Sequence, residues 1–454
     1  MAYYTWKSYK LTSSPLEIFS ALDGGRNRFF LDSSLGADYS LGRYSFIGVD
    51  PFKIISARNR DKLDLVRSEL EKYKIDPPAN SPPFLGGAVG YLAYDIGYLF
   101  EKKLRRRIKS DLSLPDLFFA FYNTAIIIDH LKGVFGIFAA GFPEKGSALQ
   151  KALAEENIRK TERTIFDKSV PLAARETRVR ISGLRSDFTK AGYIAAVKKA
   201  KQYIKDGDVY QVNLAQRFCG RTNLSASGIY ERLRLENPVY FGAYLDTGEF
   251  QIISSSPERF LSLRGDAVIT RPMKGTRPRT GDQAGDTKMR NELISSPKDR
   301  AELMMIVDLE RNDLGRVCSY DSVKVETLRR LEEYNTVFQT TANIYGRLHK
   351  NKDRIDLLRA CSPGGSITGC PKIRAMEIIE ELEHSRRGIY TGSLGYLSFS
   401  GDMDFNILIR TILKIQSRIY FGVGGGVVAD SDPEAEYRET LVKAEGMMRA
   451  LGAK

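Results

Sequence analysis

The sequence predicts a layered chain of strands and helices, of the α+β or α/β class. Two observations lead to this prediction. In residues 1–165, short apolar runs such as 29–31, 44–47 and 125–128 are separated by Gly, Asp and Pro, which is typical of strands. From residue 187 onward, strand-like and helix-like segments alternate, so we expect helices to pack against sheets.

Local patterns place the individual elements in chain order. A glycine-rich turn at 84–95 leads into an aromatic strand or helix, and 168–186, poor in large apolar side chains, is the predicted linker. A helix begins at Asp187 or Thr189 and continues to residue 204, because apolar residues recur there at helical spacing. Strands are predicted at 209–218, 240–245, 250–254 and 267–271. Further helices begin at 296–297, 371 and 432–433; in the first and last of these, Ser or Asp caps the helix and Pro takes its first position.

Length and composition indicate a globular protein of about two domains. The chain has 454 residues, of which 42% are hydrophobic and 28% charged. The longest apolar stretch, 117–128, is too short to cross a bilayer, and the N-terminus does not resemble a signal peptide, so we expect a cytoplasmic protein without a membrane partner. The four cysteines show no CxxC spacing and there are only three histidines. The chemistry is therefore expected to use carboxylates, lysine, hydroxyls and backbone amides.

The net charge of +13 admits more than one explanation. A basic nucleic-acid-binding protein is one, but the densest basic run, 102–109, has no interleaved aromatic residue and matches no recognition module. A solvated surface loop explains the run itself. An anionic small substrate, or simple solubility, explains the overall balance equally well.

Two predicted helices carry carboxylate pairs. Asp299 and Glu302 are spaced i,i+3 on one helix, and Glu436 and Glu439 have the same spacing on another, where Lys443 follows on the same face. A solvated charged face is one interpretation. The other is an Mg²⁺ site, because carboxylate oxygens from facing helices are the hard ligands that Mg²⁺ prefers.

Three glycine- or proline-rich segments could bind an anion or aim a side chain. Residues 420–427 end a predicted strand in three glycines, which could form a hairpin or an anion-binding turn. Residues 362–372, which include Thr368, form a glycine-rich turn entering a helix, where free amides favour a carboxylate or phosphate. In 271–279, Lys274 follows a strand between Pro and Gly, and either lies on a basic surface loop or points its amine inward.

Six segments of the chain resemble those of a known family. They are 86–95, 207–213, 255–260, 271–279, 305–316 and 424–443. Together they resemble the chorismate-utilising enzymes, a family that includes the anthranilate, aminodeoxychorismate, isochorismate and salicylate synthases. Residues 1–167 resemble the N-terminal region of its anthranilate-forming members, and 187–452 the chorismate-binding catalytic domain. The resemblance implies an α+β fold of layered antiparallel β-sheets flanked by helices.

The resemblance also implies roles for individual residues in an Mg²⁺-assisted displacement of the C4 hydroxyl of chorismate. Glu258 matches the acid that protonates this hydroxyl. Glu302 and Glu439 match the metal ligands, with Glu436 and Asp299 behind them, although the family usually has Glu at the position of Asp299. The positions that match the substrate-binding residues are Arg410, Tyr390, Gly425, Gly426, Lys443, Gln211 and Thr368. Gln339 stands where relatives usually have His, so a proton-shuttling role is lost there.

Two positions distinguish the reactions of the family. Isochorismate-forming members have a basic lysine where this chain has Gln211, and Gln cannot activate water. Anthranilate-forming members usually have Ala at the position of Lys274, whereas members that form 4-amino-4-deoxychorismate have a lysine that acts as a covalent nucleophile. We therefore expect amination of chorismate in p-aminobenzoate and folate biosynthesis, through a neutral Lys274 amine that burial or the nearby Arg271 and Arg277 would favour. Anthranilate formation in tryptophan biosynthesis is the alternative.

The expected nitrogen source is a partner subunit. None of the four cysteines lies in a glycine-flanked elbow, and no matched segment belongs to a glutaminase. A glutamine amidotransferase is therefore expected to supply ammonia, as in a heterodimer.

A second ligand site is possible in the first half of the chain. Relatives form a tryptophan pocket from segments that match Ser34, Arg43, Tyr44, Ser45, Phe46, Pro238, Val239 and Tyr240. The same aromatic residues could equally pack in the core without a ligand. If the pocket is retained, we expect tryptophan to stabilise the fold rather than inhibit.

Overall fold

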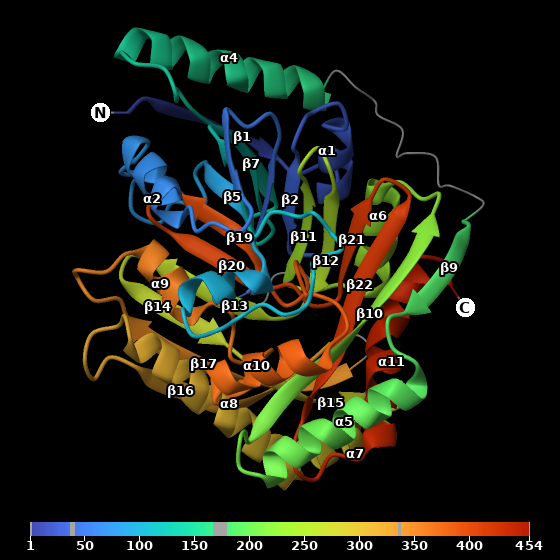
Figure 1. Cartoon of the computed structure of the whole chain (residues 1–454). Helices are drawn as coiled ribbons and strands as arrows, with labels where there is room; N and C mark the ends of the chain where they lie inside the picture. The colour runs from blue at the N-terminus through green and yellow to red at the C-terminus, as the bar shows by residue number, and fades with distance from the viewer. Residues whose placement is uncertain (1, 37–40, 167–178, 335–336, 454) are drawn as a thin grey trace.

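The computed structural model of the chain describes residues 2–36, 41–166, 179–334 and 337–453. Two large β-sheets dominate it, with helices on their outer faces and between their ends (Figure 1). Every strand pairing in both sheets is antiparallel for the described residues. The predicted α+β fold of layered antiparallel sheets is confirmed.

The first sheet draws strands from the whole length of the chain. In spatial order its strands are β1 (Tyr4–Lys10), β8 (Val134–Ala140), β7 (Thr124–Asp129), β3 (Tyr44–Gly48), β2 (Phe29–Asp32), β11 (Phe241–Asp246), β12 (Gln251–Ser256), β21 (Thr411–Ile415), β22 (Arg418–Val427), β10 (Gln211–Thr222) and β18 (Gly369–Cys370), and β9 (Ile181–Ser186) also pairs with β10. The predicted linker at 168–186 lies largely outside the described residues, and its last part is β9.

The second sheet is also shared between the two halves of the sequence. Its order is β15 (Met273–Pro278), β17 (Val337–Arg347), β14 (Ala267–Arg271), β13 (Arg259–Arg264), β20 (Met403–Ile407), β19 (Ser393–Ser398), β5 (Gly87–Leu92), β6 (Leu117–Tyr122) and β4 (Lys53–Ala57), with β16 (Lys324–Glu333) beside β17. Side chains from the facing surfaces of both sheets form one continuous apolar core, which includes Phe46, Phe84 and Tyr396.

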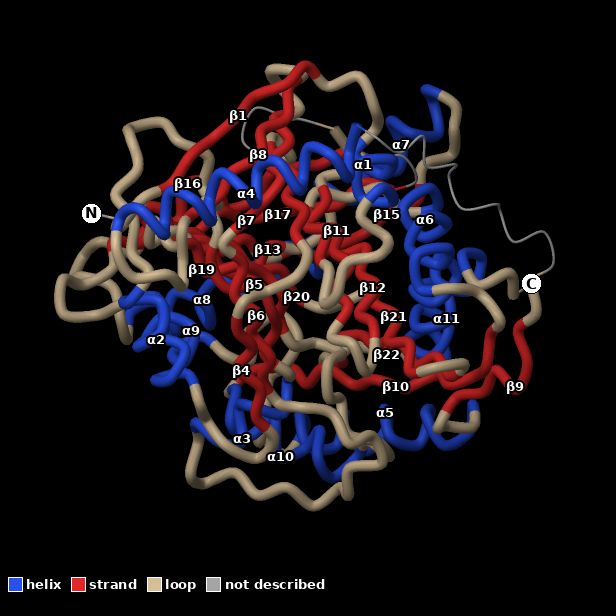
Figure 2. Tube along the Cα trace, turned by 90° about the horizontal axis from the view of Figure 1, so that it is seen from above, coloured by secondary structure: helices blue, strands red, loops and turns tan. Residues whose placement is uncertain are grey.

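The helices cover the outer faces and close the ends. They are α1 (Pro15–Ala21), α2 (Leu63–Lys72), a 3₁₀ turn (Tyr94–Ile96), α3 (Gly97–Phe100), α4 (Ser147–Phe166), α5 (Lys190–Lys205), α6 (Ala226–Glu236), α7 (Gln283–Ser295), α8 (Pro297–Gly315), α9 (Arg354–Cys361), α10 (Lys372–Leu382) and α11 (Pro433–Ala450). Seen from above, α4 runs across β1 and β8, while α6 and α11 lie together beside β12 and β22 (Figure 2). Within the described ranges, none of these helices has the length and apolar character needed to cross a membrane.

Local capping explains where several helices begin. The predicted caps are present: the hydroxyl of Ser296 accepts from the Asp299 amide at the start of α8, and Asp432 accepts from Ala435 at the start of α11. Thr189, not Asp187, caps α5. The three glycines at 424–426 lie inside β22, paired with β10, so the hairpin interpretation of this segment is wrong. The reason is that a long neighbouring strand supplies hydrogen bonds all along this segment.

Candidate active site

Glu258 is a buried carboxyl group between β12 and β13. It is 5% exposed, and the hydroxyl of Ser366 donates to its Oε1 at 2.5 Å. Burial raises the pKa of Glu258 to about 7, although the hydrogen bond from Ser366 and the charges of Lys274 and Lys443 act in the opposite direction. A carboxyl group with this pKa can hold a proton near neutral pH and still release it, which is what a general acid requires.

Lys274 lies on β15. It is half-buried, and its positive charge lowers the pKa of Glu258, Glu302 and Glu439 alike. The amine therefore lies within electrostatic reach of both the buried acid and the carboxylates of α8 and α11. The predicted inward orientation of Lys274 is consistent with this arrangement.

A bulge in β15 accompanies this orientation. The register with β17 shifts between Lys274 and Thr276, and Gly275 between them has φ +75°. A Cβ at Gly275 would lie 3.1 Å from the carboxyl group of Asp299, so only glycine allows α8 to approach this closely.

The two arginines that flank Lys274 are both engaged with carboxylates. Arg271 forms an ion pair with Glu332, and Arg277 pairs with Asp299 at 2.9 Å. Their charges are thus largely balanced locally.

Two carboxylates on different helices, Glu302 of α8 and Glu439 of α11, lie within electrostatic reach of Lys274. Burial raises the pKa of Glu302 and of Glu436, and Glu439 raises both further by like-charge repulsion. Lys443, 2.7 Å from Glu439, lowers the pKa of that carboxyl group. The mutual repulsion shows that α8 and α11 present their carboxylates to a common space, as the i,i+3 spacing predicts.

These carboxylates are chemically suited to a divalent cation. They offer hard oxygen donors, and a cation would relieve their mutual repulsion. Within the described ranges, however, no three His, Cys, Asp or Glu side chains are arranged around one point closely enough to hold a metal ion. Asp299 is turned toward Arg277, and the hydroxyl of Ser431 donates to Glu436 at 2.6 Å. Glu439 is likewise paired with Lys443 at 2.7 Å, and Glu302 lies 3.9 Å from Lys298, so each of the four carboxylates has a protein partner.

The glycines of β22 leave space beside these carboxylates. A Cβ at Gly425 would lie 3.1 Å from Glu436 Oε2, and one at Gly426 would lie 2.9 Å from Gln211 Nε2. Lys443 donates to the carbonyl of Gly424 at 2.9 Å. Because glycine has no side chain, a ligand can come close to the backbone of this strand.

Several buried polar groups on β10 and β17 have no hydrogen-bond partner among the described residues. Both side-chain polar atoms of Gln211 are buried without a hydrogen bond in the described part of the chain, as are Asn213 Oδ1 and Gln339 Oε1. Each such orphaned group costs about 1–3 kcal/mol unless a ligand or water satisfies it. Gln211 was predicted to bind substrate; Asn213 was not, because a polar residue within a strand carries no distinctive pattern.

The remaining predicted substrate-binding residues have different surroundings. Arg410 is half-buried with φ +49°, and among the described residues its guanidinium makes no hydrogen bond or ion pair. Tyr390 packs against Gly422, where a Cβ would lie 2.4 Å from the ring. Thr368 donates its hydroxyl hydrogen to the carbonyl of Gly364 or Gly365 within its own turn. Its carbonyl accepts from the Asn213 amide at 2.8 Å, so the protein itself already occupies most of its polar groups.

A buried ion pair that the sequence did not reveal supports this region from behind. Arg387, in the turn after α10, pairs with Glu383 at 2.7 Å, and both side chains are almost fully buried. Arg387 also donates to the carbonyls of Asn213 and Ile367 at 2.8 Å, and Glu383 accepts from the Ala215 amide. The pair thus joins β10 to the 362–371 turn that carries Ser366. Its i,i+4 spacing was visible in the sequence, but nothing indicated its burial.

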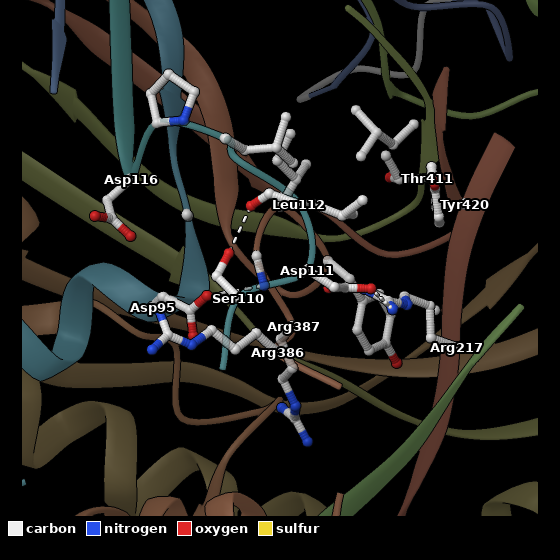
Figure 3. Close-up of a pocket in the computed structure, with 18 of the residues that line it drawn as sticks. Asp95, Ser110, Asp111, Leu112, Asp116, Arg217, Arg386, Arg387, Thr411 and Tyr420 are labelled. Atoms are coloured by element: carbon white, nitrogen blue, oxygen red, sulfur yellow. Dashed lines mark hydrogen bonds and ion pairs between the residues drawn. The ribbon is translucent and has the colours of Figure 1, made fainter. Parts of the chain in front are cut away.

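Two cavities lie away from the Glu258–Lys274 centre. A small one, of about 50 Å³, is lined by Asp95, Ser110, Asp111, Arg217 and Arg386 (Figure 3), and Tyr390 also lines it. In it, Arg217 donates to Asp111 at 3.0 Å and Ser110 donates to the carbonyl of Leu112 at 2.6 Å. Because neither Lys274 nor Glu258 lines it, this cavity is separate from the centre described above.

The larger cavity, of about 390 Å³, lies between the sheets at the predicted tryptophan residues. Arg43, Tyr44, Phe46 and Tyr240 line it, whereas Ser34, Ser45, Pro238 and Val239 do not. The Ser34 hydroxyl instead accepts from the Val239 amide at 2.9 Å, and Ser45 contacts His130. The structure therefore brings four of the eight predicted residues to one cavity.

A buried acid, an inward lysine and two helical carboxylate pairs between antiparallel sheets define an enzyme that acts on a small anionic substrate. The family model described as chorismate binding enzyme matches residues 27–449, and the chain belongs to this family. Aminodeoxychorismate synthase component 1 of Bacillus subtilis (strain 168) is 37% identical over 94% of this chain and 92% of its own length. Anthranilate synthase component 1 of Aquifex aeolicus (strain VF5) is 36% identical over 97% and 92%. The crystal structure of anthranilate synthase component I from Streptococcus pneumoniae TIGR4 has a TM-score of 0.81 and 31% identity, over 90% of this chain and 92% of that one.

Proposed function

We propose that the chain aminates chorismate with ammonia to give 4-amino-4-deoxychorismate, for p-aminobenzoate and folate biosynthesis. The observation that carries this proposal is Lys274, which lies within electrostatic reach of Glu258 and of the helical carboxylates. Members of the family that form anthranilate usually have alanine at this position. The relatives named for the two reactions are similarly identical to this chain, so overall identity does not separate them.

In the proposed reaction, Lys274 acts at C2 of chorismate and Glu258 acts at the hydroxyl group on C4. The neutral Lys274 amine forms a bond to C2, while Glu258 gives its proton to the C4 hydroxyl, and the C4–O bond breaks to release water. Ammonia then forms a bond to C4, and the bond between C2 and Nζ breaks to return the lysine. The nitrogen added at C4 carries one proton more than the amino group of the product. This proton passes to the Glu258 carboxylate and restores the acid.

Binding is proposed to use mainly groups that have no hydrogen-bond partner among the described residues. Arg410 and the side chain of Gln211 can hydrogen-bond to the substrate, with Tyr390, Lys443, the turn at Thr368 and the backbone of Gly425 and Gly426 around them. Glu302 and Glu439, with Glu436 and Asp299 behind them, are proposed to hold Mg²⁺. When bound, Mg²⁺ would supply positive charge that balances a substrate carboxylate.

The deciding experiment supplies chorismate, ammonium and Mg²⁺ to the purified chain and identifies the product by mass. Aminodeoxychorismate is expected; anthranilate with pyruvate would establish the alternative. Lys274→Ala should abolish product formation. The matched control is Lys298→Ala on α8, which removes another positive charge that acts on Glu302 but no proposed nucleophile. Equal product from Lys274→Ala and wild type at saturating ammonia would disprove the covalent role.

The ammonia is proposed to come from a glutamine amidotransferase subunit. The four cysteines are free thiols. Cys318 and Cys361 are buried, so these two are poorly placed for glutaminase chemistry. The isolated chain is expected to use ammonium salts but not glutamine. Efficient use of glutamine by the isolated chain would contradict this.

The cavity beside Tyr44 is proposed to bind tryptophan. Its volume suits an indole ring, its aromatic wall includes Phe46, and Asp404 and Arg259 supply polar groups. Without a ligand, the same residues line a partly empty space in the core.

A further inference from the structure

A second buried carboxyl group lies near Glu258 and has no part in the reaction above. Glu310, on α8, is 7% exposed, compared with 5% for Glu258. The two approach the same turn: a Cβ at Gly365 would lie 3.3 Å from Glu310 Cγ, and the next residue, Ser366, holds Glu258. Two acids buried this close together cannot both ionise without a large electrostatic cost.

The hydrogen bonds of Thr270 indicate that Glu310 carries a proton. The Thr270 hydroxyl lies 2.6 Å from the carbonyl oxygen of Phe260 and 2.8 Å from Glu310 Oε2. A hydroxyl has one hydrogen, and a carbonyl oxygen can only accept, so the hydrogen of Thr270 is committed to Phe260. The contact with Glu310 is then satisfied when Glu310 is the donor, which requires its neutral acid form.

We propose that Glu310 is a positioning residue for Glu258, because the two buried carboxyls keep one shared proton between them after the first proton has been lost. This inference rests on the role of Glu258 proposed above. The shared proton can reside on either group, so Glu258 remains available as an acid at a pH where an isolated carboxyl group would have lost its proton.

Titratable groups on several neighbouring elements face this pair. Glu310 faces Asp313 on its own helix, Cys361 at the end of α9, Lys372 on α10 and Glu258; Glu258 faces Lys274 on β15, Lys443 on α11 and Ser366. Asp313 and Lys372 form an ion pair and nearly cancel as charges. The two carboxyls are therefore the main uncompensated acids in this part of the interior.

The size of the effect follows from the acidity of each group. Burial, and then the charge of Glu258, raises the pKa of Glu310 to about 8, while that of Glu258 is about 7. The value for Glu310 already contains the charge of Glu258, so with one proton left on the pair, Glu258 carries it in at least roughly one molecule in ten. The alkaline side of the wild-type pH profile should therefore be extended, with at least about a tenth of the maximum kept while one proton remains on the pair.

The test compares Glu310→Gln with wild type by kcat/KM for chorismate at each pH from 6 to 9.5. Glutamine keeps the size and a hydrogen-bond donor but removes the titrating proton. The ratio of variant to wild type should be about five- to tenfold lower at pH 9 than at pH 6.5, because the variant lacks this extended alkaline side. Taking a ratio cancels the titration of ammonia and of Lys274. Glu144→Gln, at an exposed site, should give a constant ratio, and a constant ratio for Glu310→Gln would overturn the proposal.

A second measurement requires no turnover and also applies if Glu310→Gln does not fold. Carbon-13 NMR of the glutamate carboxyl groups should show two groups that titrate above pH 6 in a coupled manner, and Glu258→Gln should lower the midpoint of the Glu310 signal. An unchanged midpoint would overturn the shared proton. The identity of the product does not enter this measurement, so failure of the proposed reaction and failure of this inference can be told apart.

Discussion

Arg387→Met tests whether the buried ion pair behind the site holds it together. The side chains of Arg387 and Glu383 are 2% and 4% exposed, so the substitution leaves a buried carboxylate and two carbonyls, of Asn213 and Ile367, without their donors. Loss of one partner of such a pair lowers the free energy of unfolding by about 3–5 kcal/mol. For 454 residues, an unfolding entropy of about 2.1 cal/mol/K per residue gives roughly 1 kcal/mol/K, so the melting temperature should fall by about 3–5 °C.

The pH dependence of this loss provides a second readout. Burial already raises the pKa of Glu383 even with Arg387 present, and without Arg387 it will rise further. Glu383 in the variant will therefore take up a proton on folding. The folded variant then binds more protons than the unfolded variant. The difference in free energy of unfolding between wild type and variant should therefore grow as pH rises above the unfolded pKa of Glu383.

Arg449→Met is the matched control for Arg387→Met. Arg449 and Glu445 have the same i,i+4 spacing at 3.5 Å, but both side chains are more than half exposed. Exposed pairs contribute about 0–1 kcal/mol, so the melting temperature should change by less than about 1 °C. Equal melting temperatures for the two variants would show that the buried pair does not stabilise the site, and the reasoning would be wrong.

Three further predictions concern the acid, the metal and the second cavity. Ser366→Ala removes a hydrogen bond that favours the Glu258 carboxylate, so the pKa of Glu258 should rise and the alkaline fall of kcat/KM should move up by about one pH unit; an unmoved profile would contradict this. Glu302→Gln should raise at least about tenfold the Mg²⁺ concentration that restores activity after chelation, and an unchanged Mg²⁺ titration would exclude Glu302 as a ligand. Millimolar tryptophan should raise the melting temperature without lowering activity; no shift would mean that the cavity beside Tyr44 does not bind it, and inhibition would indicate feedback control.

Local sequence signals predicted the structure well only where the cause was itself local. The starts of α8 and α11 were correct because a capping residue and a proline act within one turn. Residues 283–295 were not predicted as a helix, although Asp282 caps α7, because the segment has little apolar periodicity. The glycines of β22 were assigned to a turn because their pairing with β10 involves residues more than two hundred positions away.

In the site, too, residues were predicted where a local pattern or a family motif marked them, and missed where the cause was a distant contact. The carboxylates of α8 and α11 were found by their spacing, and Lys274 and Glu258 by resemblance to a family. Ser366 and Glu310 were missed because their partners, Glu258 and Thr270, are distant in the chain. Only the folded arrangement shows that these acids are buried together.

The sharing of both sheets between the two halves of the chain has a consequence for biosynthesis. Leu92 of β5 pairs with Ser393 of β19, and Phe29 of β2 with Leu245 of β11, so early strands pair with neighbours that are made much later. At about 5–20 residues per second, roughly 300 residues take on the order of 15–60 s to synthesise. During that time β5, which is buried along its whole length in the finished protein, has no partner on its β19 side. The nascent chain should therefore depend on holdase chaperones until its C-terminal strands emerge from the ribosome.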